Sequence, residues 1–341
     1  MMGADRRVLH DLHVSTDLSF STFQILAAVS EALGILNLTG GRVLLVGMPM
    51  PLPQEAVPGV ELVHYNHALG SDEPLQGVHL PFEDSSFALV VACHALEKFA
   101  SSSRPLLLRE LARISGNFLL VISPFDSPII ATGLGALDEI HRSVQGLSHP
   151  LVGQLRKLGL PSLDATRIAM AADMGYAPEV VPMTSLRSWA LFEMLECVAP
   201  VFDRGRVTLS RLNRFYNTRL GRIDHGQPTF RHLLLAHKGS KPLKAGVAKA
   251  LRETFSPGGS EAEIQTARDL LRLVLDGFAE VEAPMAVPQD KLKNLRRLEE
   301  LERKSNIQAR TIEHLNNEIY YLKNASNSVS TVTRIRKFFS R

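Results

Sequence analysis

The chain has 341 residues, of which 45% are hydrophobic and 21% charged, an ordinary balance for a soluble globular protein with one large or two modest domains. Its 38 basic and 35 acidic residues give a net charge of only +3, so total charge predicts no nucleic-acid binding. Two cysteines form neither a disulfide framework nor a metal cluster, and no apolar run is long enough to span a membrane, so we expect a cytoplasmic protein.

Helix and strand patterns alternate from the first organised segment onward. Residues 21–35 begin with a capping-box pattern, Ser21-x-x-Gln24, and carry a broad apolar stripe, which predicts a helix that lies against a sheet. Two short apolar runs follow at 43–46 and 60–65, each beside a glycine. We expect both runs to be buried strands.

The most informative stretch is 77–97, GVHLPFEDSSFALVVACHALE. Its Leu-Pro-Phe segment cannot continue a helix, because proline fixes its own backbone and pushes its predecessor into extended geometry. A polar turn follows at 83–86, and residues 87–93 have the length and apolarity of a strand covered on both faces. A helix pattern at 105–114 and an apolar run at 118–122 continue the alternation. Short connections of this kind predict parallel strands with helices on both faces of the sheet.

The order Leu-Pro-Phe-x-Asp-x-Ser-Phe-x-x-Val-Val followed by His-x-Leu-Glu resembles the fourth-strand region of class I S-adenosylmethionine-dependent methyltransferases. The resemblance covers residues 20–125, and it is to small-molecule and glycan-modifying members, type 11-like and polysaccharide-associated. It implies an α/β fold with a doubly wound, mostly parallel, Rossmann-like sheet, to which this chain adds a C-terminal helical extension and a coiled coil. It also implies S-adenosylmethionine as the cofactor.

The same resemblance implies a set of cofactor-binding residues. In the family, the first strand ends in a glycine-rich turn that lets the backbone approach the cofactor, whereas this chain has Gly-Met-Pro-Met-Pro-Leu-Pro at 47–53. The family also has a ribose-binding carboxylate after the second strand and an adenine contact before the Leu-Pro-Phe segment. The positions implied here are Gly47, Met48, Asn66, Gln76, His79 and Leu80. The alternative is that the polar residues among them are surface groups at strand ends.

His94 is the candidate catalytic base. It follows the predicted strand 87–93 and matches the family's His-x-Leu-Glu, and such strand ends open into the ligand crevice of doubly wound sheets. Imidazole titrates near neutral pH, which suits it to accept a proton from an acceptor. The alternative is a packed or solvated histidine without a catalytic role.

Residues 126–230 are less regular and resemble the lid or substrate segment of the polysaccharide-associated members. We expect a helix at 163–174, an amphipathic helix at 185–197 with Trp189 in the core, and a strand at 232–236. Gly133 and Gly135 predict a turn before a helix, and strand-like residues occur at 179–181. The candidate residues for binding a sugar or a carboxylate are Asn217, Asp224, His225 and Arg231. Interlocking loop hydrogen bonds are the alternative explanation for these four.

The composition changes after residue 238, and it divides the chain into four parts. These are an α/β domain at 1–238, a helical linker region at 239–288, a coiled coil at 289–325 and a basic aromatic tail at 326–341. Apolar residues on two seven-residue series predict about four heptads and self-association, with packing onto the chain's own domain as the alternative. The tail pairs basic residues with aromatic ones, so it is a candidate for peripheral contact with an anionic membrane, or else a frayed terminus.

Two hypotheses of function follow from these patterns. The first is a methyltransferase that acts on a glycan, a glycan precursor or another small-molecule acceptor, in which the protein positions a nucleophile and a base beside an activated methyl group. The second is a methyltransferase fold without catalytic activity, which binds a partner and is arrayed by the coiled coil. Neither hypothesis includes a metal or a nucleic acid.

Overall fold

The computed structural model describes residues 15–38, 40–49, 51–52, 59–65, 79–201 and 205–256. The predicted coiled coil, the tail and most of the linker region lie outside the described residues, and so do the candidate cofactor residues Asn66 and Gln76. No metal-binding group of histidine, cysteine or acidic residues is found in the described ranges.

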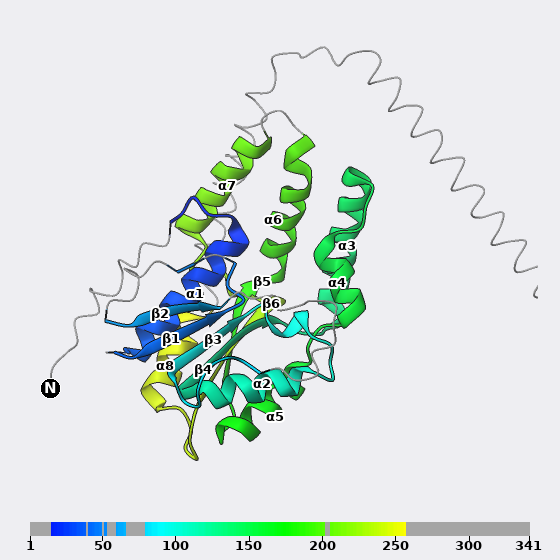
Figure 1. Cartoon of the computed structure of the whole chain (residues 1–341). Helices are drawn as coiled ribbons and strands as arrows, with labels where there is room; N and C mark the ends of the chain where they lie inside the picture. The colour runs from blue at the N-terminus through cyan, green and yellow to red at the C-terminus, as the bar shows by residue number, and fades with distance from the viewer. Residues whose placement is uncertain are drawn as a thin grey trace, which may run out of the picture. The chain divides into compact units, whose positions relative to one another are not determined.

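A mixed sheet of six strands forms the centre of this part of the chain, in the order β2-β1-β3-β4-β6-β5 (Figure 1). Its strands are β1 Arg42–Val46, β2 Glu61–Tyr65, β3 Phe87–Cys93, β4 Ser115–Pro124, β5 Glu179–Ser185 and β6 Thr229–His237. The first four strands pair in parallel, which confirms the prediction for them. β6 lies antiparallel between β4 and β5, which the strand pattern at 232–236 did not predict.

The strand order reverses at β1. The chain passes from β1 outward to β2, and it then returns to the other side of β1 to form β3. In open α/β sheets, the loops at such a reversal leave in opposite directions and open a crevice at the carboxyl ends of the strands. The crevice expected here therefore lies beside the ends of β1 and β3.

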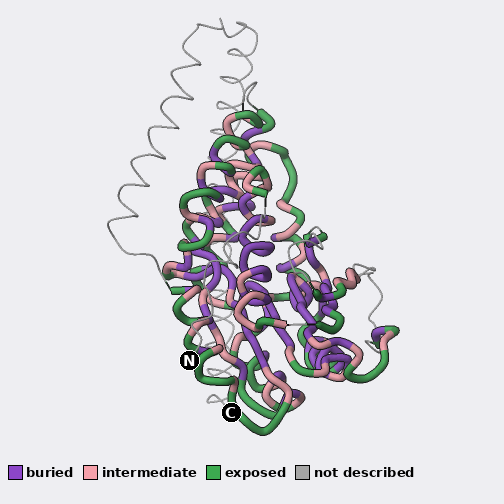
Figure 2. Tube along the Cα trace, turned by 90° about the vertical axis from the view of Figure 1, so that its left-hand side faces the viewer, coloured by how far each residue is buried: buried purple, intermediate pink, exposed green. Residues whose placement is uncertain are grey.

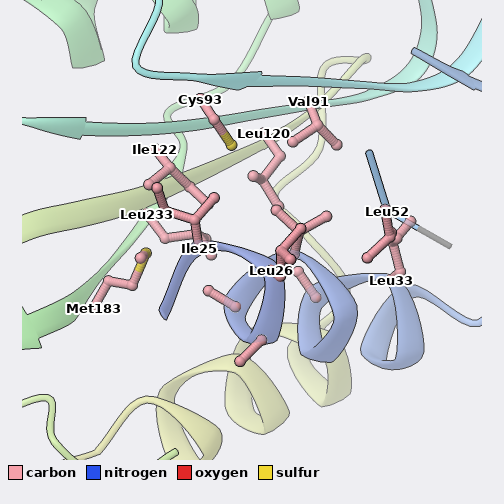
Figure 3. Close-up of a cluster of buried hydrophobic side chains, with 14 of the residues drawn as sticks. Ile25, Leu26, Leu33, Leu52, Val91, Cys93, Leu120, Ile122, Met183 and Leu233 are labelled. Atoms are coloured by element: carbon pink, nitrogen blue, oxygen red, sulfur yellow. The ribbon is translucent and has the colours of Figure 1, made fainter. Parts of the chain in front are cut away.

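Helices cover both faces of the sheet. Along β1 and β3, alternate residues enter two separate hydrophobic cores, as the two-residue period of a strand requires. Helices α1 Phe20–Leu36 and α8 Ala245–Thr254 contribute to the first core, part of which is drawn in Figure 3. Helices α2 Arg104–Ile114 and α5 Leu163–Met174 contribute to the second. Double coverage explains why the strand sequences are nearly continuous apolar runs.

Helix α1 begins at Phe20, and its cap is Ser19, two residues before the predicted cap Ser21. The Ser19 hydroxyl accepts a hydrogen bond from the backbone N–H of Thr22, and the helix ends at Asn37 in the left-handed conformation. Gln24 does not complete a capping box, because its side-chain amide donates to the Gly221 carbonyl at 2.7 Å. The apolar stripe located the helix correctly, but a long-range contact uses the residue that resembled a cap.

A layer of helices rises from the carboxyl edge of the sheet (Figure 1). It consists of α3 Pro128–Gln145, α4 Pro150–Leu158, α6 Leu186–Val198 and α7 Gly205–Arg219, with short 3-10 turns at Leu96–Lys98 and Ala199–Val201. This layer has its own hydrophobic core, in which Trp189 is fully buried and stacks on Phe230 with 3.7 Å between ring centroids. The predicted core position of Trp189 is therefore confirmed.

The turn predicted at Gly133 and Gly135 is wrong, because both glycines lie inside α3. Gly133 faces α6, where a Cβ would lie 3.2 Å from the Leu186 side chain, so the glycine permits close packing of the two helices.

Among the described helices, none has both the length and the hydropathy that crossing a bilayer requires.

Candidate functional site

Five polar side chains meet at the carboxyl edge of the sheet, below the helical layer. We call them the edge cluster: they are His94 after β3, Glu97 in the following 3-10 turn, Ser123 in β4, Glu193 in α6 and Arg231 in β6. The cluster lies next to the reversal point of the sheet, because His94 directly follows the strand that pairs with β1. Its members come from five separate elements.

The backbone at His94 is held in an uncommon conformation. Its φ angle is +49°, in the left-handed region that residues other than glycine rarely occupy, and its N–H donates to the Ile122 carbonyl at 3.0 Å. Gly47, at the end of β1, has φ +71°, and a Cβ there would lie 2.2 Å from the Cys93 carbonyl oxygen. The close approach of these two strand ends therefore fixes the chain just before His94.

Glu97 orients the His94 ring. One carboxylate oxygen contacts Nδ1 of His94, and the other accepts a hydrogen bond from the Ser123 hydroxyl at 2.9 Å. Although burial acts to raise the pKa of Glu97, the positive charge and hydrogen bond of His94 and the bond from Ser123 hold it below its ordinary value. An ionised carboxylate only accepts, so Nδ1 of His94 is the donor in this contact, and Nε2 is the ring nitrogen left to face an acceptor hydroxyl.

Arg104 fixes the turn that carries Glu97. Its buried guanidinium donates to the carbonyls of Leu96 and Phe99 at 3.0 and 3.1 Å, and to the Leu160 carbonyl at 3.0 Å. Burial lowers the pKa of Arg104, and the charge of Glu97 opposes that shift. Arg104 therefore joins the turn to the segment between α4 and α5, and it adds a positive charge near the buried carboxylate.

Arg231 has unused hydrogen-bonding capacity although it is only 2% exposed. Its Nη2 donates to the Ser21 hydroxyl at 2.6 Å, while Nε and Nη1 are buried without a hydrogen-bond partner in the described part of the chain. Burial lowers the pKa of Arg231 to about 10, and the charges of Glu193 and Glu97 oppose that shift. Since buried donors are normally bonded, two free N–H groups indicate a place where a ligand or water binds.

Helix α6 carries Glu193 of the edge cluster and, three residues further on, a second acidic residue, Glu196. Burial raises the pKa of Glu193, against the charge of Arg231 and a hydrogen bond from Ser21. Burial together with the neighbouring Glu193 raises the pKa of Glu196 to about 7. Glu193 and Arg231 thus act on each other as opposite charges, and ionisable groups with shifted pKa values gather in one region, which is typical of a binding or catalytic site.

Of the other cofactor candidates, Met48 lies in the loop after β1 and is buried. Met48 and Leu52, in the loop after β1, are 4% and 2% exposed and belong to the first core, where Figure 3 draws Leu52 together with Leu33 of α1. The two apolar side chains of this loop anchor it to the helix that covers the sheet. Between them, Pro49 and Pro51 are exposed and have no backbone N–H to offer a ligand.

His79 and Leu80 are attached to the last turns of α2. The Leu80 N–H donates to Oε1 of Glu110 at 2.7 Å, and the exposed His79 ring lies 3.1 Å from the same oxygen. Arg113 also donates to Glu110 and to the Phe82 carbonyl, so the loop before β3 is bound firmly to α2. The Leu80 side chain is buried in the second core.

Among the predicted substrate-binding residues, Arg231 belongs to the edge cluster. Asn217 lies at the end of α7 and donates to the carbonyls of Thr16 and Leu18 at 3.0 and 2.9 Å. These two bonds use both hydrogens of its amide and hold the segment that leads into α1. Asn217 therefore has a clear structural contact in addition to the role predicted for it.

Asp224 and His225 lie in the loop between α7 and β6. The Tyr216 hydroxyl donates to Asp224, while Nδ1 of His225 contacts the Met183 carbonyl and Nε2 lies 3.0 Å from the Arg222 carbonyl. Burial lowers the pKa of His225, and its contacts with Met183 and Arg222 oppose that shift. Both side chains thus interlock the loop with β5 and α7.

Pattern recognition found His94 and Arg231 but gave no role to Glu97, Ser123 or Glu193. Glu97 was visible as the last residue of the His-x-Leu-Glu match. Ser123 precedes Pro124 at a strand end, which is a position where ligand-binding groups occur in α/β folds. Glu193 has no comparable local signal, because it is one of several polar residues in an amphipathic helix.

Comparisons with known proteins give similarity at the level of solved structures. No protein-family model matches the chain, and no curated protein matches it. The solved structures that it is similar to include the YcgJ protein from Bacillus subtilis, at 14% identity and TM-score 0.32, covering 63% of this chain and 99% of that one. An S-adenosylmethionine-dependent methyltransferase from Thermotoga maritima has 14% identity and TM-score 0.33, covering 64% and 92%. Magnesium protoporphyrin IX methyltransferase from Synechocystis, with bound S-adenosylhomocysteine, has 11% identity and TM-score 0.34, covering 70% and 90%.

Proposed function

We propose that the protein is an S-adenosylmethionine-dependent methyltransferase that acts on a hydroxyl group of a glycan, a glycan precursor or a related small molecule. The observation that carries the proposal is the contact between His94 and the buried Glu97 at the carboxyl edge of the sheet. A histidine oriented by a carboxylate is an arrangement suited to proton abstraction from a hydroxyl. The motif resemblance around β3 supplies the reaction class.

The charged groups of the edge cluster fit one end of the cofactor. S-adenosylmethionine, when bound, supplies a methyl group activated by positively charged sulfur, and its amino-acid end carries a carboxylate and an ammonium. The free N–H groups of Arg231 suit the carboxylate, and the carboxylates of Glu97 and Glu193 offer acceptors for the ammonium. For the adenosine end, the predicted residues Asn66 and Gln76 lie outside the described residues.

In this proposal His94 accepts the proton of the acceptor hydroxyl at Nε2. Glu97 holds the ring through Nδ1 and stabilises the imidazolium that forms, while Ser123 and Arg104 keep Glu97 in place. The helical layer above the cluster, within the segment 126–230 predicted to be a lid, would exclude water and bind the acceptor. The choice of a glycan acceptor follows from the motif resemblance.

The test is calorimetric titration of the full chain with S-adenosylhomocysteine, which binds without reacting. We expect a measurable heat for the wild type, a much weaker one for R231Q, and near wild-type binding for the control D164N, which changes an exposed acidic residue on α5. His94→Asn should leave binding of S-adenosylhomocysteine intact and abolish transfer of labelled methyl groups to a panel of sugars. Absence of heat at millimolar ligand would remove the proposal.

A second candidate function is supported by the loop after β1. Because Met48 and Leu52 fill the core and the exposed prolines lack N–H donors, this loop does not form the glycine cradle of the family. The corresponding proposal is a scaffold that binds a partner protein and oligomerises through the predicted coiled coil at 289–325. Analytical ultracentrifugation of the full chain, together with a negative titration, would favour the scaffold over the enzyme.

A further inference from the structure

A second buried side chain with an unused polar atom lies beside Arg231. Thr184, in β5, is 0% exposed, and its hydroxyl oxygen has no hydrogen-bond partner among the described residues. Thr184 and Arg231 are direct partners across the antiparallel pair of β5 and β6, so their Cβ atoms lie about 5 Å apart. Figure 2 shows buried residues running through the strands of the sheet. The unmet polar atoms of Thr184 and Arg231 therefore share one small region of the interior.

An irregularity in β5 puts Thr184 on this face of the sheet. Pro182 pairs with His232 and Thr184 pairs with Arg231, so Met183 is an extra residue on β5. In a regular strand Thr184 would share a face with Pro182 and His232, because side chains alternate between the two faces. The bulge instead turns Thr184 to the face of Arg231, and bulges of this kind re-aim side chains beside functional sites.

Neighbouring side chains hold the guanidinium of Arg231 in place. Its Nη2 donates to the Ser21 hydroxyl at the start of α1, which leaves Nε and Nη1 without a partner among the described residues. Its central carbon lies 4.9 Å from the centre of the Phe230 ring, and that ring stacks on Trp189 of α6. The unused N–H groups are therefore fixed in direction before any ligand binds, which lowers the entropy cost of binding one.

Thr184 and Arg231 form the inner end of the edge cluster. The cluster meets solvent at His94 and Glu193, which are partly exposed, whereas its other members are buried. A ligand that enters past His94 and Glu193 would place its far end at Thr184 and Arg231, out of contact with water. Hydrogen bonds to a charged group are strongest in such surroundings.

The unmet groups at this inner end favour a ligand group that only accepts hydrogen bonds. Nε and Nη1 of Arg231 are donors without acceptor capacity, and the Thr184 hydroxyl can donate as well. A carboxylate has acceptors only, and its charge is opposite to that of the guanidinium. We propose that Thr184 and Arg231 form a carboxylate subsite at the inner end of the edge cluster.

The carboxylate subsite extends the site of the proposed function, where the carboxylate could come from either of two molecules. One is the amino-acid end of the cofactor, and the other is an acceptor that is an acidic sugar. Both present the same chemical group to Thr184 and Arg231. Two pairs of probes separate the sources, because the members of each pair differ in the carboxylate: S-adenosylhomocysteine with its decarboxylated form, and glucuronate with glucose.

The experiment is calorimetric titration of the full chain with these four probes, the sugars with and without S-adenosylhomocysteine. We expect T184V to bind the carboxylate member of one pair about tenfold more weakly than the wild type, and the other member equally well, because only a hydrogen bond to the charged group is lost. T184S keeps the hydroxyl and should bind as the wild type does. The matched control is T166V on α5, since Thr166 is also buried but its hydroxyl donates to the Ser162 carbonyl at 2.8 Å. T166V should leave all four titrations unchanged.

Urea unfolding without ligand gives a second measurement. Because the Thr184 hydroxyl has no partner to lose, the unfolding midpoint of T184V should equal or exceed that of the wild type, whereas T166V should have a lower midpoint. A lower midpoint for T184V would overturn the proposal, because it would mean that the hydroxyl is bonded within the chain. So would equal titrations of T184V and the wild type with both carboxylate probes, or a wild type that binds neither probe.

The remaining outcomes assign the source of the carboxylate. A T184V effect confined to S-adenosylhomocysteine would place the cofactor carboxylate in the subsite. An effect confined to glucuronate would place the acceptor there and define an acidic sugar as the substrate class. If glucuronate shows that effect and S-adenosylhomocysteine gives no heat, the carboxylate subsite stands and the methyltransferase proposal fails.

Discussion

Replacing Gly47 by alanine tests whether the contact between the ends of β1 and β3 fixes the position of His94. Two costs arise at this residue. The φ angle of +71° strains any residue with a Cβ, by about 1–2 kcal/mol. The added Cβ would also lie 2.2 Å from the Cys93 carbonyl oxygen, a backbone atom at the end of β3, which parallel pairing such as that of Val46 with Ala92 holds beside the end of β1. Separating the packed strand ends costs about 1–3 kcal/mol more, so we expect G47A to lose about 2–5 kcal/mol of unfolding free energy.

Two other glycines separate these costs. Gly146 has nearly the same angle, φ +75°, but open space around it, so G146A should lose only the strain of about 1–2 kcal/mol. Gly135 lies inside α3 with no atom within 4 Å of an added Cβ, and G135A should gain about 0.5–1 kcal/mol from helix propensity. The difference between G47A and G146A therefore measures the close approach itself.

The assay is urea unfolding followed by circular dichroism, with the slope m compared among the three variants and the wild type. Equal destabilisation of G47A and G146A would refute the reasoning, because it would mean that the strand ends separate at no cost. G47A should also weaken binding of S-adenosylhomocysteine, since the displaced Cys93 carbonyl directly precedes His94. G146A should bind as the wild type does, which controls for loss of stability alone.

Three further predictions concern single side chains. Glu196 keeps its proton in the folded state up to about pH 7, whereas the unfolded chain ionises it near 4.5, so the wild type loses stability as pH rises through this window. Because Glu196 is partly exposed, solvent screens the effect, and the free energy of unfolding of E196Q in urea should exceed that of the wild type by about 1–2 kcal/mol near pH 8 and equal it near pH 4. Equal free energies of unfolding at both pH values would contradict the pKa shift. The cycle H94G, E97Q and H94G/E97Q should show a coupling of about 1 kcal/mol or more, and additive effects would mean that the contact does not orient the ring. L52A should lose about 2–5 kcal/mol, and a near-neutral result would show that the loop after β1 is not anchored in the core.

The sequence pattern predicted those helices and strands whose bounds are set by neighbouring residues in the chain. Strand 87–93 and helix 163–174 appear with the predicted bounds, because one is a continuous apolar run and the other has an apolar face between a serine cap and a glycine. The antiparallel position of β6 was not predictable in this way. The direction of β6 depends on the edge at which the chain re-enters the sheet. That edge is set by the path of the helical layer and not by the residues of the strand.

The residues of the candidate site also fall into those that a local pattern predicts and those that it does not. His94 was found because a strand end predicts a crevice, and that rule needs only the strand. Glu193 and Ser123 meet it from α6 and β4, and nothing within their own segments indicates that they share a site. At Gly133 the local pattern predicted a turn that does not exist. The glycine lies inside α3, where the lack of a side chain lets the helix pack against α6.

The energetics of the edge cluster bear on the choice between an enzyme and a scaffold. Two buried nitrogens of Arg231 have no hydrogen-bond partner among the described residues, and each unmet buried donor costs about 1–3 kcal/mol of stability. Burial also raises the free energy of the charged forms of Glu193 and of its neighbour Glu196, as their raised pKa values show. Apolar side chains of similar size would make a scaffold more stable at the same positions. The edge cluster therefore lowers the stability of the fold, and a bound charged ligand would offset that loss. This loss favours a binding site over a purely structural interior.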